Sequence, residues 1–161
     1  TLHNTLFPYT TLFRSGTYRS ASIYFQTPED RTVTFGPELG PVTLTTVETE
    51  PYARLRAEYA RQSEYDRYWF VSFDQDDDGV SRTVQIYVTD DYQDGGDIDL
   101  TVPAFSGLAG WDDAWGLVPG EEATWTFLTS GWDEEGGALG PMDPGTGVGI
   151  RTAIETGFIT P

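Results

Sequence analysis

The sequence of 161 residues contains no cysteine and no lysine, and its one histidine is His3, close to the start of the chain. Cysteine–histidine pairs, thiolate zinc sites and, beyond the first few residues, the Ser-His-Asp triad are therefore excluded. The lack of lysine also excludes Schiff-base catalysis and the P-loop. Of the familiar catalytic sets, a pair of carboxylates is the main one that this composition leaves.

Basic side chains are scarce, because only nine arginines face 26 aspartates and glutamates, which gives a formal net charge of −17. Nucleic acids and anionic membranes are bound through basic surfaces, so we expect neither as a partner. No apolar run approaches the ~20 residues that are needed to cross a bilayer, and we therefore expect no transmembrane segment.

The opening stretch differs from the rest of the chain because residues 1–15 contain no acidic side chain. Read in codons, Thr5 to Ser15 resembles a DNA adapter used in sequencing. We therefore expect residues 1–15 to be an artefactual, disordered tail and residues 16–161 to form a single domain. On this interpretation, any native N-terminal signal or lipid anchor is missing from the fragment.

Turn residues divide the rest of the chain into short segments of alternating polarity, which is typical of β-strands. Arg82 to Thr89 alternates cleanly, and Tyr68 to Phe73 is its expected partner across an Asp-Gly turn. Pro51 to Arg61 fits a helix or a strand, and we favour a strand because its neighbours are strands. The other expected strands are Arg31 to Phe35, Val42 to Glu48, Asp97 to Val102, Ala123 to Thr129 and Val148 to Ile159. This spacing predicts an all-β sandwich or barrel.

Two parts of the sequence resemble known families. The stretch "GLVPGEEATWTFLTSG" resembles the corner before the penultimate strand of fibronectin type III domains, with Leu117, Pro119 and Gly120 at the turn and Trp125 near the aromatic position. Residues 51–68 and 100–117 are similar to uncharacterised envelope lipoproteins of GC-rich environmental bacteria. These resemblances imply a single antiparallel immunoglobulin-like or fibronectin type III-like sandwich of about 7–9 strands. They also imply a secreted or envelope-anchored location, and no activity.

Two loops are rich in aspartate. The first has the spacing of the start of an EF-hand before Gly79, but the twelfth position is Gln85 and not the glutamate that an EF-hand requires. A solvated turn and a calcium site of another kind both fit these loops, since calcium would relieve the repulsion between carboxylates. The residues are Asp74, Asp76 and Asp78 in the first loop, and Asp90, Asp91 and Asp94 in the second.

The five tryptophans divide into two groups. Trp69 and Trp125 lie on expected strands, and we expect both in the core. Trp111 and Trp115 are four residues apart, so a short helical turn near residues 111–115 would place them on one face. They fit either a plug for the open end of the sandwich or an exposed platform for sugars, which Trp132 could join.

A long loop rich in glycine, proline and acids is expected between Gly131 and Gly149. It contains Asp133 and Glu134, which could serve as a carboxylate pair, but nothing in the sequence fixes the distance between them. We therefore expect no enzymatic activity. The sequence predicts a non-catalytic exported module with a structural or adhesive role at the cell envelope, monomeric or part of a larger surface protein. The alternative is a carbohydrate-binding module, organised by calcium or free of cofactors; the partner is an unknown protein or glycan.

Overall fold

The computed structural model describes residues 12–14, 16–23, 30, 32–93, 95–132 and 149–161. Their regular structure is almost entirely β, with three short 3-10 helices, which confirms the predicted class and the helical turn near residues 111–115. The strands are β1 (Leu12–Arg14), β2 (Thr17–Ile23), β3 (Val42–Glu48), β4 (Arg54–Tyr59), β5 (Tyr68–Asp77), β6 (Val80–Thr89), β7 (Ile98–Thr101), β8 (Ala123–Trp132) and β9 (Gly149–Ile159). The 3-10 helices are η1 (Ser63–Tyr65), η2 (Asp90–Tyr92) and η3 (Asp113–Trp115).

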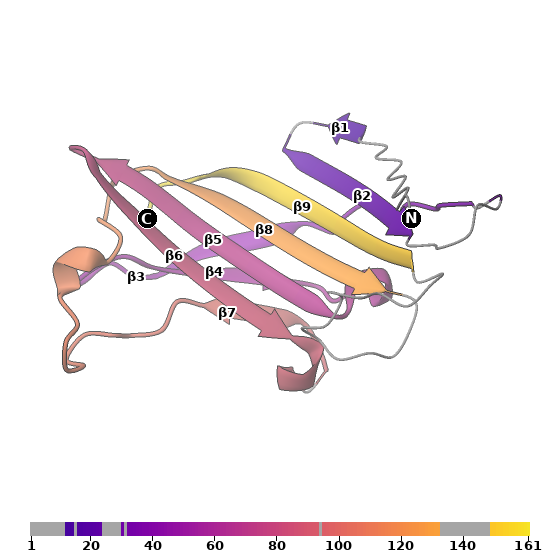
Figure 1. Ribbon diagram of the computed structural model, residues 1–161. Helices are drawn as coiled ribbons and strands as arrows, with labels where there is room; N and C mark the ends of the chain where they lie inside the picture. Colours follow the sequence, from indigo (N-terminus) through magenta and orange to yellow (C-terminus); the bar gives the residue numbers. More distant parts are fainter. Residues whose placement is uncertain (1–11, 15, 24–29, 31, 94, 133–148) are drawn as a thin grey trace, which may run out of the picture.

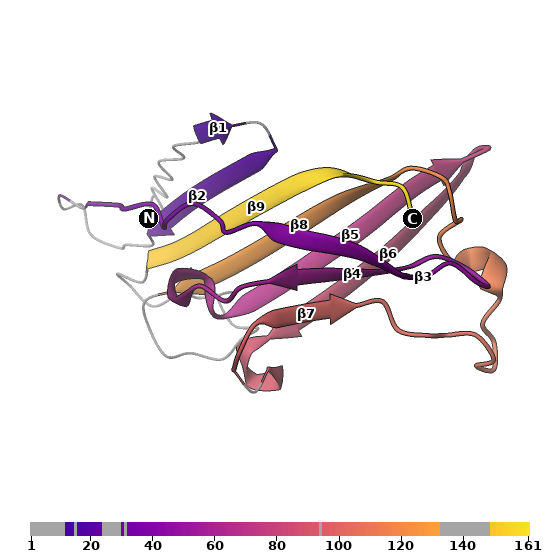
Figure 2. The same cartoon turned by 180° about the vertical axis from the view of Figure 1, so that it is seen from behind.

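The strands form two antiparallel sheets that pack as a sandwich. The larger sheet has the order β1-β2-β9-β8-β5-β6, and the smaller has the order β3-β4-β7. The larger sheet lies in front in Figure 1, and the smaller sheet lies in front in Figure 2. We call the face of the larger sheet that is turned toward the smaller one its inner face, and the opposite face its outer face.

The hairpin of β5 and β6 shows how local sequence sets this architecture. The two strands pair without a register shift from Tyr68 opposite Thr89 to Asp77 opposite Val80. Only Asp78 and Gly79 connect them, and both have positive φ angles, 46° and 80°. Two such residues form a type I′ turn, whose twist matches that of the flanking strands. The hairpin predicted from the Asp-Gly pair is therefore confirmed.

The core lies between the inner face of the larger sheet and the smaller sheet. Because side chains alternate along a strand, β5 sends every second residue inward. Its Trp69, Val71 and Phe73 are completely buried against Leu55 of β4 and Leu100 of β7, among others. Trp125 of β8 is also buried. The prediction that Trp69 and Trp125 are core residues is thus confirmed.

Most predicted strands form, but one does not. The ambiguous segment from Pro51 to Arg61 forms β4, as we expected. The predicted strand from Arg31 to Phe35 is wrong, because its described residues, 32–35, have no strand partner. The residues that follow are held by side chains instead of by a neighbouring backbone: the Gly36 carbonyl accepts from the Arg19 guanidinium, and the Pro37 carbonyl accepts from the Tyr65 hydroxyl.

The sequence did not predict β2, which pairs with β9 along its whole length. Among its described side chains only Ala21 is buried, so its apolar alternation is weak. β1 lies inside the stretch that we expected to be a tail, and it pairs with β2. Among the described residues, no helix is long and apolar enough to cross a membrane.

Candidate functional site

An aromatic cluster lies at the end of the sandwich where β6 begins and β8 begins. Trp111 is at its centre, with ring centroids 4.8 Å from Phe105, 5.7 Å from Tyr52 and 5.7 Å from Trp115. The Trp111 indole is partly buried, and its Nε1 donates to Asp113 over 3.1 Å. The Trp115 ring meets Trp111 edge-on, at 83°, and is 59% exposed. Trp111 is therefore a packing residue, whereas Trp115 faces solvent.

The support beneath this cluster is rigid. Tyr52 is buried, and its hydroxyl accepts from the Phe105 backbone N–H over 2.6 Å. A Cβ atom at Gly116 would lie 2.3 Å from the Tyr52 ring, so only glycine fits where η3 ends. At the start of η3, the Asp112 side chain accepts from the backbone N–H of Ala114. These contacts fix the turn that carries Trp115.

The Gln75 side chain hydrogen-bonds the segment that follows η3 to the larger sheet. This side chain is 2% exposed, donates to the carbonyls of Val118 and Glu121, and accepts from the Val118 N–H. A buried polar side chain is stable only when such groups are satisfied, and here both ends of the amide are. Sequence analysis missed Gln75 because the expected strand ended at Phe73, whereas β5 continues to Asp77.

Trp132 does not join Trp111 and Trp115. It is the last residue of β8, a ten-residue strand whose first residue, Ala123, lies at the Trp115 end. A strand of that length spans about 30 Å. Its register partner is Ile150 of β9, on the outer face of the larger sheet. The platform of three tryptophans that the sequence suggested is therefore not assembled in one place.

The two aspartate loops are also separated. One lies at the β5–β6 turn and the other at η2, at opposite ends of the ten-residue strand β6. Asp74 accepts from the hydroxyls of Ser72 and Thr83, whereas Asp76 and Asp78 are exposed at the turn. Asp94 lies outside the described residues. Within the described part of the chain, no three histidine, cysteine, aspartate or glutamate side chains are grouped to hold a metal ion.

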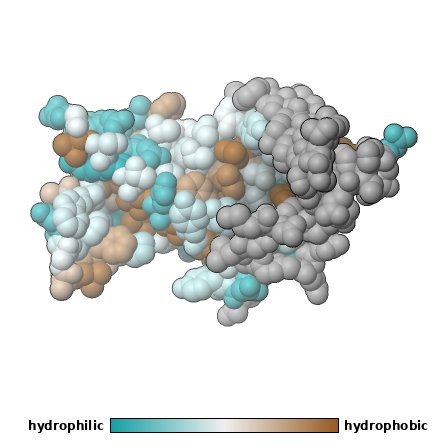
Figure 3. Space-filling model, in the orientation of Figure 1, coloured by the Kyte–Doolittle hydropathy of each residue, from teal (hydrophilic) through white to brown (hydrophobic). Residues whose placement is uncertain are grey.

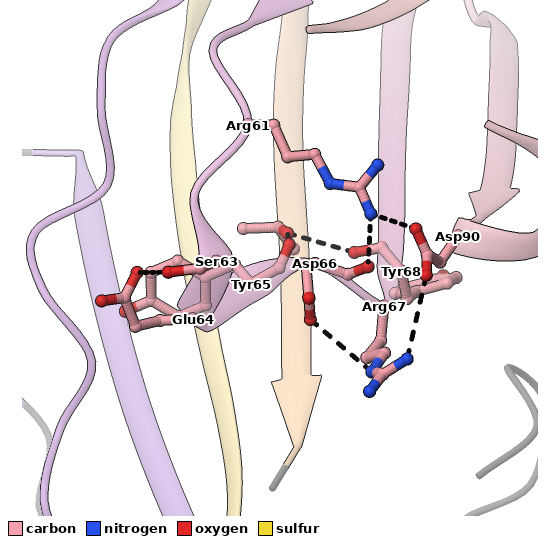
Figure 4. Close-up of polar contacts among 9 residues, drawn as sticks. Arg61, Ser63, Glu64, Tyr65, Asp66, Arg67, Tyr68 and Asp90 are labelled. Carbon is pink, nitrogen blue, oxygen red and sulfur yellow. Dashed lines mark hydrogen bonds and ion pairs between the residues drawn. The ribbon is translucent and has the colours of Figure 1, made fainter. Parts of the chain in front are cut away.

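Asp90 belongs to a charged network at the η2 end. Figure 4 shows the Arg61 guanidinium pointing toward the Asp90 carboxylate, with which it forms an ion pair. The second Asp90 oxygen lies 3.8 Å from the Arg67 guanidinium. Arg61 also stacks over the Trp69 ring at 5.1 Å. The Asp90 carboxylate is thus already matched with two cations, while the neighbouring Asp91 is exposed.

Carboxyl groups with shifted pKa values lie in different sheets. Burial alone would raise the pKa of Asp99 on β7, but hydrogen bonds from Thr101 and Arg56 lower it overall. Burial raises the pKa of Glu155 on β9, and a hydrogen bond from the Val42 backbone offsets this only in part. The candidate pair Asp133 and Glu134 lies outside the described residues.

The outer face of the larger sheet carries a feature that sequence analysis missed. Successive register partners across β6, β5, β8 and β9 form a line of large apolar side chains, which we call the apolar row. Its members are Tyr87, Phe70, Leu128 and Ile154. Tyr87 is 59% exposed and the other three are partly exposed. The signal was the set of apolar residues at outward positions of predicted strands, but only the register shows that they adjoin.

No family model, no curated protein and no solved structure matches this chain.

Proposed function

We propose that the chain is a non-catalytic, exported interaction module with an adhesive or structural role at the bacterial cell envelope. The observation that carries this proposal is Trp115, a large apolar side chain that a rigid stack of aromatic rings keeps 59% exposed. Leu108 on the same loop is 57% exposed. Apolar groups that are held in solvent by well-packed neighbours are typical of contact surfaces.

The strand order supports the immunoglobulin-like resemblance and, through it, the envelope location. Sandwiches of that type place strands C, F and G in one sheet, with C′ beyond C in the variable type, and strands A, B and E in the other. The order β6-β5-β8-β9 against β3-β4-β7 follows this pattern when β3 is taken as strand A. The β1–β2 hairpin then extends the sheet beyond strand G.

The absence of catalytic residue types supports the non-catalytic part of the proposal. The chain offers carboxylates but no cysteine, no lysine and one histidine. Asp99 is exposed between the buried Ile98 and Leu100 and so points away from the larger sheet. Glu155 lies opposite the inward-facing Phe127, so the two carboxyl groups do not face a common site.

A direct test compares Trp115→Ala with Tyr92→Ala. Tyr92 is 81% exposed on η2, at the opposite end of β6, and is the matched control. Beads coated with each protein are allowed to settle on purified bacterial cell-wall sacculi and are then washed. We expect Trp115→Ala to lower bead retention about tenfold or more, as for a central contact residue. Tyr92→Ala should leave retention unchanged. Equal retention by the wild type and Trp115→Ala would refute the proposal.

The alternative function is carbohydrate binding, with the exposed Trp115 indole as the surface that stacks on a sugar ring. Its test is Trp fluorescence during titration with soluble polysaccharides, first with calcium and then with EDTA. A saturable shift that Trp115→Ala abolishes supports this alternative. Loss of the shift in EDTA would add the carboxylates of the β5–β6 turn to the site. No shift with any polysaccharide removes the alternative and leaves the adhesive role.

A further inference from the structure

The apolar row is flanked on both sides by uncharged polar rows. The same register that aligns Tyr87, Phe70, Leu128 and Ile154 aligns their neighbours two residues away on each strand. These neighbours carry hydroxyl or amide groups. They are Gln85, Ser72, Thr126 and Thr156 on one side, and Thr89, Tyr68, Ser130 and Thr152 on the other. None of the three rows contains a charged residue, although 22% of the whole chain is charged.

The two rings of the row, Tyr87 and Phe70, are in contact, and the Tyr68 ring of a flanking row lies beside Tyr87. The centroids of Phe70 and Tyr87 lie 4.6 Å apart, and those of Tyr68 and Tyr87 lie 6.1 Å apart. Burial raises the pKa of Tyr68 to about 12, further above neutral pH than that of an ordinary tyrosine, which is itself protonated at pH 7 and can donate. In Figure 3, pale and brown atoms occupy the middle of this face, and teal atoms gather where the β5–β6 hairpin ends.

The distance between neighbouring members of the apolar row suits an extended sugar polymer. Neighbouring strands lie ~4.8 Å apart, which is close to the length of one pyranose residue in an extended β-1,4-linked chain. A polysaccharide laid across the strands would place one sugar over each member of the row. The C–H face of each ring would then meet an apolar side chain. Its rim of hydroxyls would meet the flanking polar rows, except at Ser72, which is 4% exposed and donates to Asp74.

The twist of the sheet favours a single polysaccharide chain as the ligand over the flat surface of a polysaccharide crystal. Adjacent strands are rotated by ~20–25° relative to one another, so four neighbouring strands do not form a plane. A rigid crystalline polymer touches such a face at only a few points. A soluble chain can follow the twist by rotating about its glycosidic bonds.

The charge of the protein favours a neutral polymer over an acidic one. The net charge of −17 repels polyanions at low salt, and the three uncharged rows offer no ion-pair partner to a charged sugar. We propose that the outer face of the larger sheet binds a single extended chain of a neutral β-linked polysaccharide along Tyr87, Phe70, Leu128 and Ile154. This site is separate from Trp115 and goes beyond the proposed envelope role.

The test is isothermal titration of the full chain with hydroxyethylcellulose, a soluble β-1,4-glucan derivative. Tyr87→Thr combined with Phe70→Thr removes two apolar groups but keeps side chains that suit a strand. We expect this variant to bind at least about tenfold more weakly. Tyr92→Thr is the matched control for the loss of an exposed tyrosine and should bind like the wild type. Should the double variant fail to fold, as judged by circular dichroism, Tyr87→Thr alone replaces it, because Tyr87 is mostly exposed.

Other probes decide between occupants of this face. Polygalacturonate, a polyanion, should not bind, and crystalline cellulose should bind much more weakly than the soluble polymer. Equal binding of hydroxyethylcellulose by the wild type and the double variant overturns the proposal. So does a dimer in sedimentation velocity that the double variant dissolves, since the face would then be an interface between copies. Trp115→Ala should leave this titration unchanged, so that failure here and failure of the envelope role are distinguishable.

Discussion

The inner and outer faces of the larger sheet are built from alternate residues of the same strands, yet they differ in what their apolar groups do. On β8, Phe127 points inward and is completely buried, with its ring 5.1 Å from that of Tyr59. The next residue, Leu128, points outward and is partly exposed. The two residues face opposite ways because successive side chains of a strand point to opposite faces of the sheet. Apolar residues therefore occur on both faces of the same strand. Only those on the inner face are fully buried, and only they are expected to contribute strongly to the free energy of unfolding.

The largest expected effect tests that difference directly. Phe127→Ala should lower the free energy of unfolding by about 3–5 kcal/mol, because it removes a fully buried ring and leaves a cavity. Leu128→Ala, one residue away, should cost about 1 kcal/mol or less, since its side chain remains in contact with water in the folded state. Urea denaturation of both variants measures the two values. Similar losses would show that the outer face is part of the core.

The second prediction concerns Gln75, one of the buried polar residues on the inner face. Gln75→Leu fills nearly the same volume but leaves the Val118 N–H and two loop carbonyls without their partner. We expect a loss of about 1–3 kcal/mol in the free energy of unfolding, the usual cost of buried unsatisfied groups. Gln85→Leu, at an exposed outward position of β6, is the control and should change stability by less than about 0.5 kcal/mol. A neutral Gln75→Leu would mean that the loop relaxes away from the sheet.

Local features of the fold were predictable because the sequence encodes them within a few residues. The alternation from Arg82 to Thr89 and the Asp78-Gly79 pair specify the β5–β6 hairpin without reference to the rest of the chain. The spacing of four between Trp111 and Trp115 likewise predicted a short helical turn that places them on one face. η3 forms there, and the centroids of the two rings lie 5.7 Å apart.

Features that depend on distant parts of the chain were not predictable in this way. Phe70, Leu128 and Ile154 adjoin only because three strands pair in one register across long connections. The direction of β8 decides that Trp132 lies far from Trp115, and residue types do not encode that direction. β2 escaped notice because its inward positions include Arg19, so its pattern is not that of a half-buried strand.

The smallest expected effect concerns a charged residue that lies across from Phe127. Glu155 is the register partner of Phe127 on β9, and burial raises the pKa of its carboxyl. A carboxyl with a raised pKa in the folded state binds its proton more tightly there than in the unfolded chain. Its ionisation therefore reduces stability as pH rises from its ordinary range through the raised value, and the penalty persists above that value.

Glu155→Gln removes this ionisation but keeps an oxygen that can accept from the Val42 backbone. We expect the variant to melt at a slightly higher temperature than the wild type at pH 7, and the two to converge near pH 4, where the wild-type carboxyl is protonated. Calorimetry across this range measures the difference. Glu122→Gln, at an exposed position just before β8, controls for the change in net charge. A variant that melts below the wild type at pH 7 would contradict the assignment, because the ionised Glu155 would then stabilise the fold.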